Sequence, residues 1–191
     1  MNLKASSLTV LLQKAGTFSE KEEALLTEQL QFVKLSKDAI VLQKGEVCSS
    51  LFFVVSGCLY QYNQDINGDQ QVMDLHIQND WVINHKSFTS RKPSEVIIQA
   101  FEDSSVYELS IDAIHQLIAQ SPSFLQMGTI LEIATERIAF FDNNNTPDEK
   151  FQFILENKPH LLQKFPQKII ASYLKMTPET LSRVRKRFTK T

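Results

Sequence analysis

The chain of 191 residues contains little cysteine, glycine or proline: two Cys (Cys48 and Cys58), five Gly and six Pro. Two thiols cannot hold a four-cysteine iron–sulfur cluster, and so low a count is typical of a reducing compartment. No segment has the biased composition of a disordered or low-complexity chain. No apolar run reaches the ~18 residues of a membrane-spanning helix, and the first residues lack the apolar stretch of a signal peptide. We therefore expect a cytoplasmic protein with no membrane partner.

Metal-binding and catalytic patterns are also missing. The histidines show no H-x-x-x-H or H-x-H spacing, which argues against a metal site; they are His76, His85, His115 and His160. We find no nucleophile–base pair, no phosphate-binding glycine loop and no clustered His and Glu ligands of the kind that cupin-like enzymes use. The sequence therefore predicts no metal, no resident cofactor and no enzymatic activity.

What the chain does have is an uneven charge distribution. Its formal net charge is −2, but residues 152–191 contain nine Lys/Arg against two acidic residues, a net charge of +7. The first 151 residues therefore carry −9. A basic block behind an acidic body is typical of a protein that binds a polyanion at one end. A solvated basic tail has the same composition, and the two interpretations differ in whether the block has a fold.

Hydrophobic periodicity indicates helices first and then strands. Roughly the first 35 residues have helical spacing, with Ser19 and Glu22 as a capping box. Segments rich in Val, Ile, Phe and Tyr then predict strands, at 39–46, 50–57, 58–65, 70–77, 95–102 and 105–110. Asn67-Gly68 indicates a hairpin turn. Such a series predicts an antiparallel jelly-roll or barrel, in which the irregular residues 80–94 are where a ligand loop would lie.

Helical spacing returns after Ser110, a candidate N-cap, and Pro122 opens a longer helix. The apolar residues of this helix repeat with the 3.5-residue period of a coiled coil. We take them as a candidate dimer seam, formed by Phe124, Met127, Leu131, Ala134, Ile138 and Phe141. The alternative is that the helix packs on the chain's own sheet, because Ile130 and Ile133 widen its apolar surface.

A domain boundary follows at "DNNNTPDEK", where three asparagines end the helix. Thr146, Pro147 and Glu149 have the residue types of an N-cap, a first helical position and an acidic third position. The chain after this point predicts a small helical domain. Its last two helices are separated by a turn at Lys175-Met176.

The last of these helices, which starts at Thr177-Pro178, has two distinct faces. One stripe is apolar, with Leu181, Val184 and Phe188, and the opposite face carries charged and hydroxyl side chains. A helix-turn-helix requires this division, because its second helix is anchored from behind and reads base edges in the DNA major groove. The turn usually has glycine where this chain has Lys175, and a non-glycine residue in the left-handed region costs ~1–2 kcal/mol.

The segment "QKIIASYLKMTPETLSRVRK" resembles the DNA-binding motif of the Crp-Fnr family of bacterial transcription regulators, whose second helix typically reads Glu-Thr-x-x-Arg. The whole chain also resembles the family in its order of elements. The resemblance implies an α+β protein with a jelly-roll sensor domain like the cyclic-nucleotide-binding domain, with flanking helices, at 1–121. A long dimerisation helix at 122–143 and an all-α helix-turn-helix domain at 144–191 would follow.

The resemblance also implies DNA-contacting residues. Glu179, Thr180 and Arg183 would contact bases, since Arg can pair with guanine O6 and N7 and Glu can accept from cytosine N4. The phosphate contacts would be Lys168, Lys175, Thr177, Ser182, Arg185, Lys186, Arg187 and Lys190. Pro178 stands where some members carry another base-contacting arginine, so the operator need not match theirs.

In cyclic-nucleotide-binding relatives, a Gly-Glu pair holds the ribose and a later Arg-Ser or Arg-Thr pair holds the phosphate. This chain has Ile83-Asn84 and Ser94-Glu95 at those positions. A glutamate there would repel a phosphate, and Arg91 or Lys92 would have to reach it from a different spacing. We therefore expect no cyclic AMP or GMP, and the effector is open. The candidate pocket consists of Ile83, Asn84, His85, Ser94 and Glu95.

The sequence thus predicts a homodimeric, sequence-specific DNA-binding transcription regulator. Its implied partners are double-stranded DNA, a second copy of the chain and RNA polymerase. The alternative is a regulatory module that binds a small ligand, such as a cyclic nucleotide, without operator-specific DNA contacts. That alternative leaves the net charge of +7 and the helix-turn-helix pattern unexplained.

Overall fold

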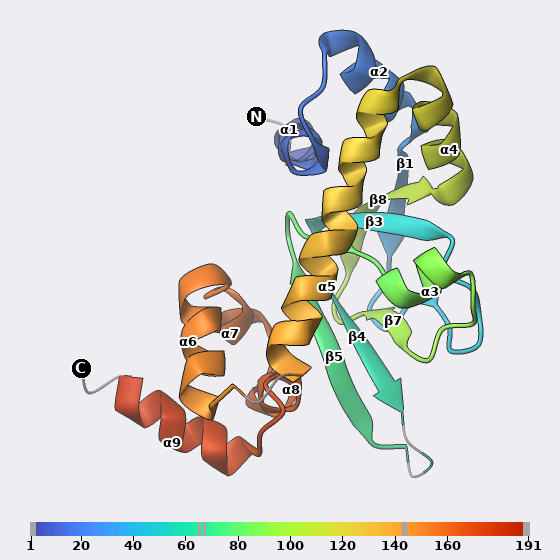
Figure 1. Cartoon of the computed structure of the whole chain (residues 1–191). Helices are drawn as coiled ribbons and strands as arrows, with labels where there is room; N and C mark the ends of the chain where they lie inside the picture. The colour runs from blue at the N-terminus through green and yellow to red at the C-terminus, as the bar shows by residue number, and fades with distance from the viewer. Residues whose placement is uncertain (1–2, 65, 67, 143–144, 189–191) are drawn as a thin grey trace.

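The computed structural model describes residues 3–64, 66, 68–142 and 145–188. Two N-terminal helices lead into a β-roll, the long helix α5 (Gly128–Asp142) crosses the roll, and a group of helices follows at the C-terminus (Figure 1). The predicted α+β class and the predicted order of elements are confirmed.

The N-terminal helices are α1 (Leu3–Ala15) and α2 (Glu20–Gln29). The capping box at the start of α2 is confirmed, because Ser19 N donates to Glu22 Oε2 at 2.8 Å and Glu22 N donates to Ser19 Oγ at 3.4 Å. The helical region was expected to continue to about residue 35, however, and it ends earlier, at Gln29. Residues Gln31–Leu35 form strand β1, whose aromatic and β-branched side chains suit its pairing with the last strand of the roll.

All six predicted strand segments are strands. They are β2 (Ile40–Leu42), β3 (Ser50–Ser56), β4 (Cys58–Gln64), β5 (Gln70–Ile77), β7 (Ile97–Ala100) and β8 (Ser104–Ser110). The short β6 (Trp81–Val82), which was not predicted, pairs with β3. Within the described residues the strands form two antiparallel sheets, in the orders β1-β8-β3-β6 and β2-β7-β4-β5.

The loop expected to be irregular contains a short helix, α3 (His85–Ser90). It forms because the Asn84 side chain caps it, accepting from Ser87 N at 3.1 Å. Ser110 is confirmed as the N-cap of α4 (Ile111–Gln120), since its Oγ accepts from Ala113 N at 3.1 Å. The helix expected from Pro122 onward is divided into a 3₁₀ segment, η1 (Pro122–Met127), and α5.

Four of the six candidate seam residues are buried inside a single chain: Phe124, Met127, Ala134 and Phe141. Leu131 and Ile138 are half-buried. The helix therefore turns most of its 3.5-residue stripe toward its own chain, as the packing alternative describes. Ile133, outside the stripe, is 55% exposed. A dimer contact through the seam stays a prediction, and only its two half-buried positions are available to a second copy.

The C-terminal helices are α6 (Pro147–Asn157), α7 (Leu161–Lys164), α8 (Gln167–Tyr173) and α9 (Pro178–Phe188). Helix α6 begins with the expected capping box, in which Thr146 N donates to Glu149 Oε2 at 2.7 Å and Glu149 N donates to Thr146 Oγ1 at 3.3 Å. We call α6–α9 the helix-turn-helix unit.

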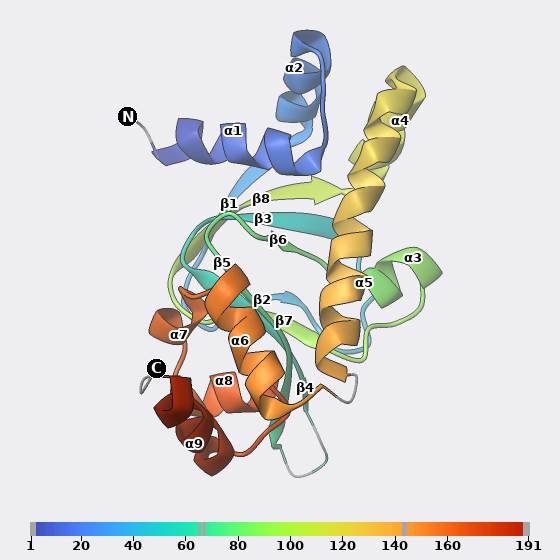
Figure 2. The same ribbon diagram turned by 60° about the vertical axis from the view of Figure 1, so that its left-hand side comes forward.

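This unit shares a hydrophobic core with the β-roll. In β4, Leu59 points into the core between the two sheets, whereas its neighbours Cys58 and Tyr60 point outward. The outward side chains of β4, β5 and β7 pack with apolar residues of α6, α7, α8 and α9. Both views place α8 against β5, the edge strand of its sheet (Figure 2). There Val72 N donates to Ser172 Oγ at 2.9 Å, so α8 occupies a backbone donor that the edge strand would otherwise expose.

Candidate nucleic-acid interface and sensor cavity

Helices α8 and α9 are joined by the predicted tight turn. Lys175 lies in the left-handed region at φ = 55°, the conformation that the turn requires. The turn is closed by Lys175 N donating to Ser172 O at 3.1 Å and Met176 N donating to Ala171 O at 3.0 Å. Ala171 is completely buried in the core that the two helices share, so its small side chain permits their close approach.

The recognition helix α9 is anchored from behind. Its N-cap is Thr177, whose Oγ1 accepts from Thr180 N at 3.2 Å. Leu181 and Val184 are buried, and the Phe188 ring meets Phe151 of α6 edge to face at a centroid distance of 5.4 Å. The apolar stripe predicted from the sequence therefore fixes α9 on the rest of the unit and leaves its other face outward.

The three predicted base-contacting residues lie together on that outward face. Glu179 and Arg183 are exposed, and Arg183 Nη2 donates to Thr180 Oγ1 at 3.3 Å. The backbone amide of Glu179 itself and the Thr177 hydroxyl lower the pKa of the Glu179 carboxyl, which keeps it an acceptor at neutral pH. The group combines an anionic acceptor, a hydroxyl and a guanidinium within two turns.

Sequence reasoning missed Gln167 at the start of α8. Its Nε2 donates to the Pro178 carbonyl at 3.2 Å and so joins the first turns of the two helices. It lines a shallow depression together with Pro178, Glu179, Ser182 and Arg183. The position next to Pro166, at the first residue of a helix, was the available signal.

The predicted phosphate contacts divide into several groups. Lys168, Arg185 and Lys186 have exposed side chains, and Ser182 is half-buried. Thr177, as the N-cap, already uses its hydroxyl. Lys190 lies outside the described residues.

Arg187 and Lys175 have partners that the sequence did not indicate. Arg187 Nη2 lies 2.7 and 2.6 Å from the two carboxylate oxygens of Asp148 in α6. Lys175 Nζ is 3.6 Å from the sulfur of Met73, and its side chain therefore extends toward the β-roll. These contacts direct both cations to other parts of the chain.

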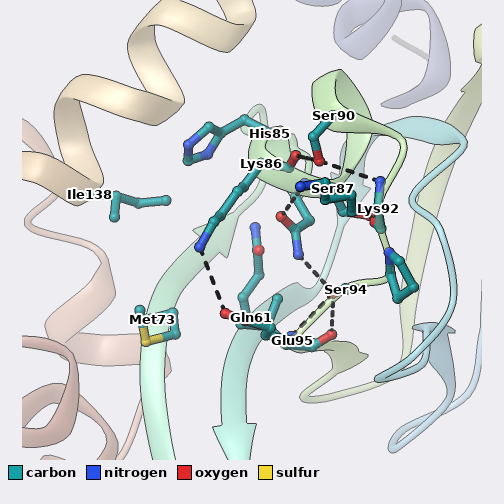
Figure 3. A pocket seen from close by; sticks show the side chains of 13 residues that line it. Gln61, Met73, His85, Lys86, Ser87, Ser90, Lys92, Ser94, Glu95 and Ile138 are labelled. Carbon is teal, nitrogen blue, oxygen red and sulfur yellow. Dashed lines mark hydrogen bonds and ion pairs between the residues drawn. The ribbon is translucent and has the colours of Figure 1, made fainter.

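A cavity of about 520 Å³ lies between the β-roll, α3 and α5. Figure 3 shows Ile138 of α5 on one side of it and the side chains of α3 and the following loop on the other. Four of the five predicted pocket residues line it: Asn84, His85, Ser94 and Glu95. The fifth, Ile83, is not among the lining residues. It is buried, and its carbonyl accepts from Gln61 Nε2 at 3.0 Å.

Four polar side chains of this cavity, those of Asn84, Ser94, Lys86 and Glu95, already have partners within the chain. Asn84 Nδ2 donates to Ser94 Oγ at 2.7 Å, and Ser94 Oγ donates to the Val96 carbonyl at 2.6 Å. Lys86 Nζ lies 3.7 Å from the Glu95 carboxylate across the opening. A ligand that uses these groups must replace internal contacts.

Of the two cations considered for the pocket, Lys92 lines the cavity and Arg91 does not. Arg91 Nη1 instead donates to the Cys48 carbonyl at 2.8 Å. The sequence missed Gln61, Met73 and Ile138 as lining residues, because they come from β4, β5 and α5. The alternation in β4, which turns Gln61 to the same side as Leu59, was the available signal.

Within the described part of the chain, no three His, Cys, Asp or Glu side chains lie close enough together to hold a metal ion. No helix described by the structure is long and apolar enough to cross a membrane.

The chain combines a jelly-roll, a long helix and a helix-turn-helix. This combination is typical of regulators that have a sensor domain and a DNA-binding domain. Residues 32–121 match the family model of the cyclic nucleotide-binding domain. The relatives below are regulators of the type that the C-terminal motif indicated, so the chain is similar to the Crp-Fnr family in this domain and in the order of its elements.

Two relatives illustrate the sequence similarity. The anaerobic regulatory protein of Haemophilus influenzae is 24% identical over 190 residues, which cover 91% of this chain and 73% of that protein. The fumarate and nitrate reduction regulatory protein of Escherichia coli is 25% identical over 171 residues, covering 82% of this chain and 68% of that protein. Such relatives favour the transcription regulator over a ligand-binding module without DNA contacts.

Solved structures support the fold. FixK2 from Bradyrhizobium japonicum matches with a TM-score of 0.66 at 18% identity, over 84% of this chain and 85% of that chain. The catabolite activator protein of Thermus thermophilus matches with a TM-score of 0.54 at 15% identity, over 93% of this chain and 86% of that chain.

Proposed function

We propose that the protein is a cytoplasmic, sequence-specific DNA-binding transcription regulator and not an enzyme. One observation carries the proposal: Glu179, Thr180 and Arg183 lie together and outward on a recognition helix whose opposite stripe is buried. The partners are double-stranded DNA, a second copy of the chain and, for transcription, RNA polymerase.

The geometry suits reading in the major groove. An arginine there pairs with guanine O6 and N7, and an ionised glutamate accepts from cytosine N4. The Thr180 hydroxyl, which accepts from Arg183, can orient the guanidinium before DNA arrives. The exposed Lys168, Arg185 and Lys186 supply cations for phosphates on either side.

We propose that the active form is a homodimer that joins through α5. Leu131 and Ile138, seven residues apart on one side of that helix, are half-buried within one chain and can be covered further by a partner. A two-fold pair of recognition helices ~34–36 Å apart would read a roughly palindromic site.

The cavity is the proposed sensor site, and we propose that its effector is not a cyclic nucleotide. Glu95 places a carboxylate at the opening, where Lys86 pairs with it, and the guanidinium of Arg91 is held outside by Cys48 O. Lys92, which lines the cavity, would then be the cation left for a phosphodiester, and its flexible ammonium cannot make the bidentate contact of an arginine. Thermal unfolding in millimolar cyclic AMP or cyclic GMP should leave Tm unchanged, whereas a ligand at 100 times its Kd would stabilise the protein by ~2.7 kcal/mol.

Selection of bound fragments from random DNA tests the main proposal. We expect the selected fragments to contain an inverted repeat, and binding to weaken as salt rises. Arg183→Ala should weaken binding by ~1–3 kcal/mol and relax the base preference at one position in each half-site. Lys21→Ala, which removes an exposed cation on α2, is the matched control and should bind as the unaltered protein does. Random DNA that yields no common sequence, with equal retention of the Arg183→Ala variant, would contradict the proposal.

A further inference from the structure

Four charged side chains meet where the β-roll, α5 and the helix-turn-helix unit come together. Asp74 of β5 pairs with Arg137 of α5, with Nε–Oδ1 at 2.9 Å and Nη2–Oδ2 at 2.5 Å. Asp80, between β5 and β6, pairs with Lys158 at the end of α6, with Nζ–Oδ2 at 2.8 Å. The Asp74 and Arg137 side chains are only 1% and 10% exposed. We call these four residues the junction cluster.

The junction cluster consists of ion pairs rather than neutral hydrogen bonds. Burial alone would raise the pKa of Asp74, but the Arg137 guanidinium holds it well below its usual range. Burial would likewise raise the pKa of Asp80, and the Lys158 ammonium lowers it. Both carboxylates are therefore ionised at neutral pH.

Buried ion pairs of this kind contribute little net stability, because desolvation offsets most of their attraction. They are directional, however, and a bidentate guanidinium–carboxylate contact permits only a narrow range of geometries. The other contacts of the interface are mainly apolar: Tyr173 of α8, for example, packs on Phe141 of α5 at a centroid distance of 4.5 Å. Apolar packing tolerates small shifts of one surface over another far better than an ion pair does.

The positions of the two ion pairs matter because β5 contacts both sides. Asp74 connects β5 to α5, the helix through which two copies would join, and Asp80 connects the end of β5 to α6. Between α5 and α6 the chain itself is a short segment around Asn145. Phe141 of α5 also contacts the unit directly, through the rings of Phe153 and Tyr173. The two buried ion pairs add a second, charged connection between α5 and the unit that runs through β5.

We propose that the junction cluster is a set of positioning residues that hold the helix-turn-helix unit in one orientation relative to α5, and thereby set the spacing between the two recognition helices of a dimer. The inference rests on the proposed function. It assigns spacing selectivity to residues that are remote from the recognition face, since Asp74, Asp80, Arg137 and Lys158 lie on other elements than α9.

The test removes one pair without leaving an uncompensated charge. In Asp80→Asn/Lys158→Met both charges are lost, and methionine retains most of the lysine chain length. Asp74→Leu/Arg137→Met treats the second pair in the same way. Lys164→Ala is the matched control: it removes the Lys164–Glu102 pair, which also connects the helix-turn-helix unit to the β-roll at 2.7 Å but is 46% and 41% exposed.

Each protein is measured against a selected operator, the same operator with 2 or 5 base pairs inserted between its half-sites, and a single half-site. The unaltered protein should prefer the original spacing by at least about tenfold, because its helices must meet grooves one turn apart. Both double variants should reduce this preference to about threefold or less and keep their affinity for a single half-site. The Tm of the Lys164→Ala control should remain unchanged.

A double variant that folds and keeps the full spacing preference would overturn the inference. So would a loss of half-site affinity that parallels a loss of Tm, because the cluster would then act on folding alone. Failure of the unaltered protein to bind any selected operator would instead overturn the proposed function, and the two outcomes are distinguishable within one experiment.

Discussion

The recognition face of α9 and the cavity beside α3 differ in where their polar groups find partners. On α9, Glu179 and Arg183 project outward and interact within their own helix. In the cavity, Asn84 and Ser94 are bonded to each other, and Lys86 is paired with Glu95. The first surface is open to an external partner, whereas the second must exchange internal contacts for external ones.

This difference indicates how each site contributes. A surface whose groups are already oriented loses little entropy on binding, and its affinity is then set by complementarity and salt. A cavity with satisfied polar groups discriminates strongly, because a ligand that does not replace each bond leaves a buried group unpaired. Variants of the anchoring core, the cavity and the flanking cations test whether the two sites differ in this way.

The largest effect is expected in the core behind the recognition face. Leu181 is 1% exposed, and Leu181→Ala should lower the free energy of unfolding by ~2–5 kcal/mol and abolish DNA binding. Urea denaturation followed by circular dichroism measures the loss. Leu155→Ala, at a 37% exposed position on α6, should cost far less. Equal losses in the two variants would show that α9 does not depend on its buried stripe.

Acid should weaken the strands below the cavity. Burial lowers the pKa of His76 from 6.5 to about 4, and Gln61, a cavity-lining residue, lies 3.0 Å from its Nε2. The imidazole of His76 is protonated below pH 6.5 in the unfolded chain, but only below about pH 4 in the folded chain. The full stability therefore exists above pH 6.5 and is lost as pH falls, by ~2 kcal/mol at pH 5.

Thermal unfolding between pH 7.5 and pH 5 tests the acid effect. His76→Gln should flatten the dependence of the unfolding free energy on pH. A His76→Gln variant with the original pH dependence would show that another group takes up the proton.

A smaller effect is expected inside the cavity. Asn84→Ala removes both the N-cap of α3 and the hydrogen bond to Ser94, and should cost ~1–2 kcal/mol of stability. Because neither Asn84 nor Ser94 belongs to the core that anchors α9, affinity for a single half-site should stay within about twofold, a change below ~0.5 kcal/mol. Calorimetry and a gel-shift titration measure the two quantities. Lost DNA binding with unchanged stability would contradict the separation of the two sites.

The smallest effect concerns Arg187. Its pair with Asp148 is about half exposed, so Arg187→Ala should change stability by less than ~1 kcal/mol. Because Asp148 neutralises it, the slope of log Kd against log salt should hardly change, whereas Lys168→Ala, at an exposed position on α8, should reduce that slope by ~0.9. Equal slopes for the two variants would show that Arg187 contacts a phosphate in spite of its pair with Asp148.

Local signals predicted most of the elements. Strand alternation located six strands, and capping residues at Ser19, Ser110 and Thr146 located three helix starts. The sequence also placed the turn at Lys175, because the apolar stripes on both sides of it admit only that arrangement. In the cavity it found four lining residues from one contiguous loop, since these are close in sequence.

The features that could not be predicted depend on contacts between residues that are far apart in the sequence. Strand β1 is a strand because β8 lies beside it, and Asp74 finds Arg137 across 63 positions of the chain. The predicted stripe begins in η1 and continues into α5, and a 3.5-residue spacing of apolar residues looks the same in sequence whether it packs on a partner or on its own chain. Only the structure shows that Phe124 and Phe141 are buried within one chain.

The shared core on the outer side of β4, β5 and β7 has a consequence for how the molecule unfolds. Tyr60, Tyr62 and Val72 are covered by the helices that follow the asparagine-rich boundary. A fragment that stops at that boundary would present these side chains to water as a continuous apolar face and would tend to self-associate. The whole chain should instead melt in a single cooperative transition, because the helices lose the core that they share with the β-roll when the roll unfolds.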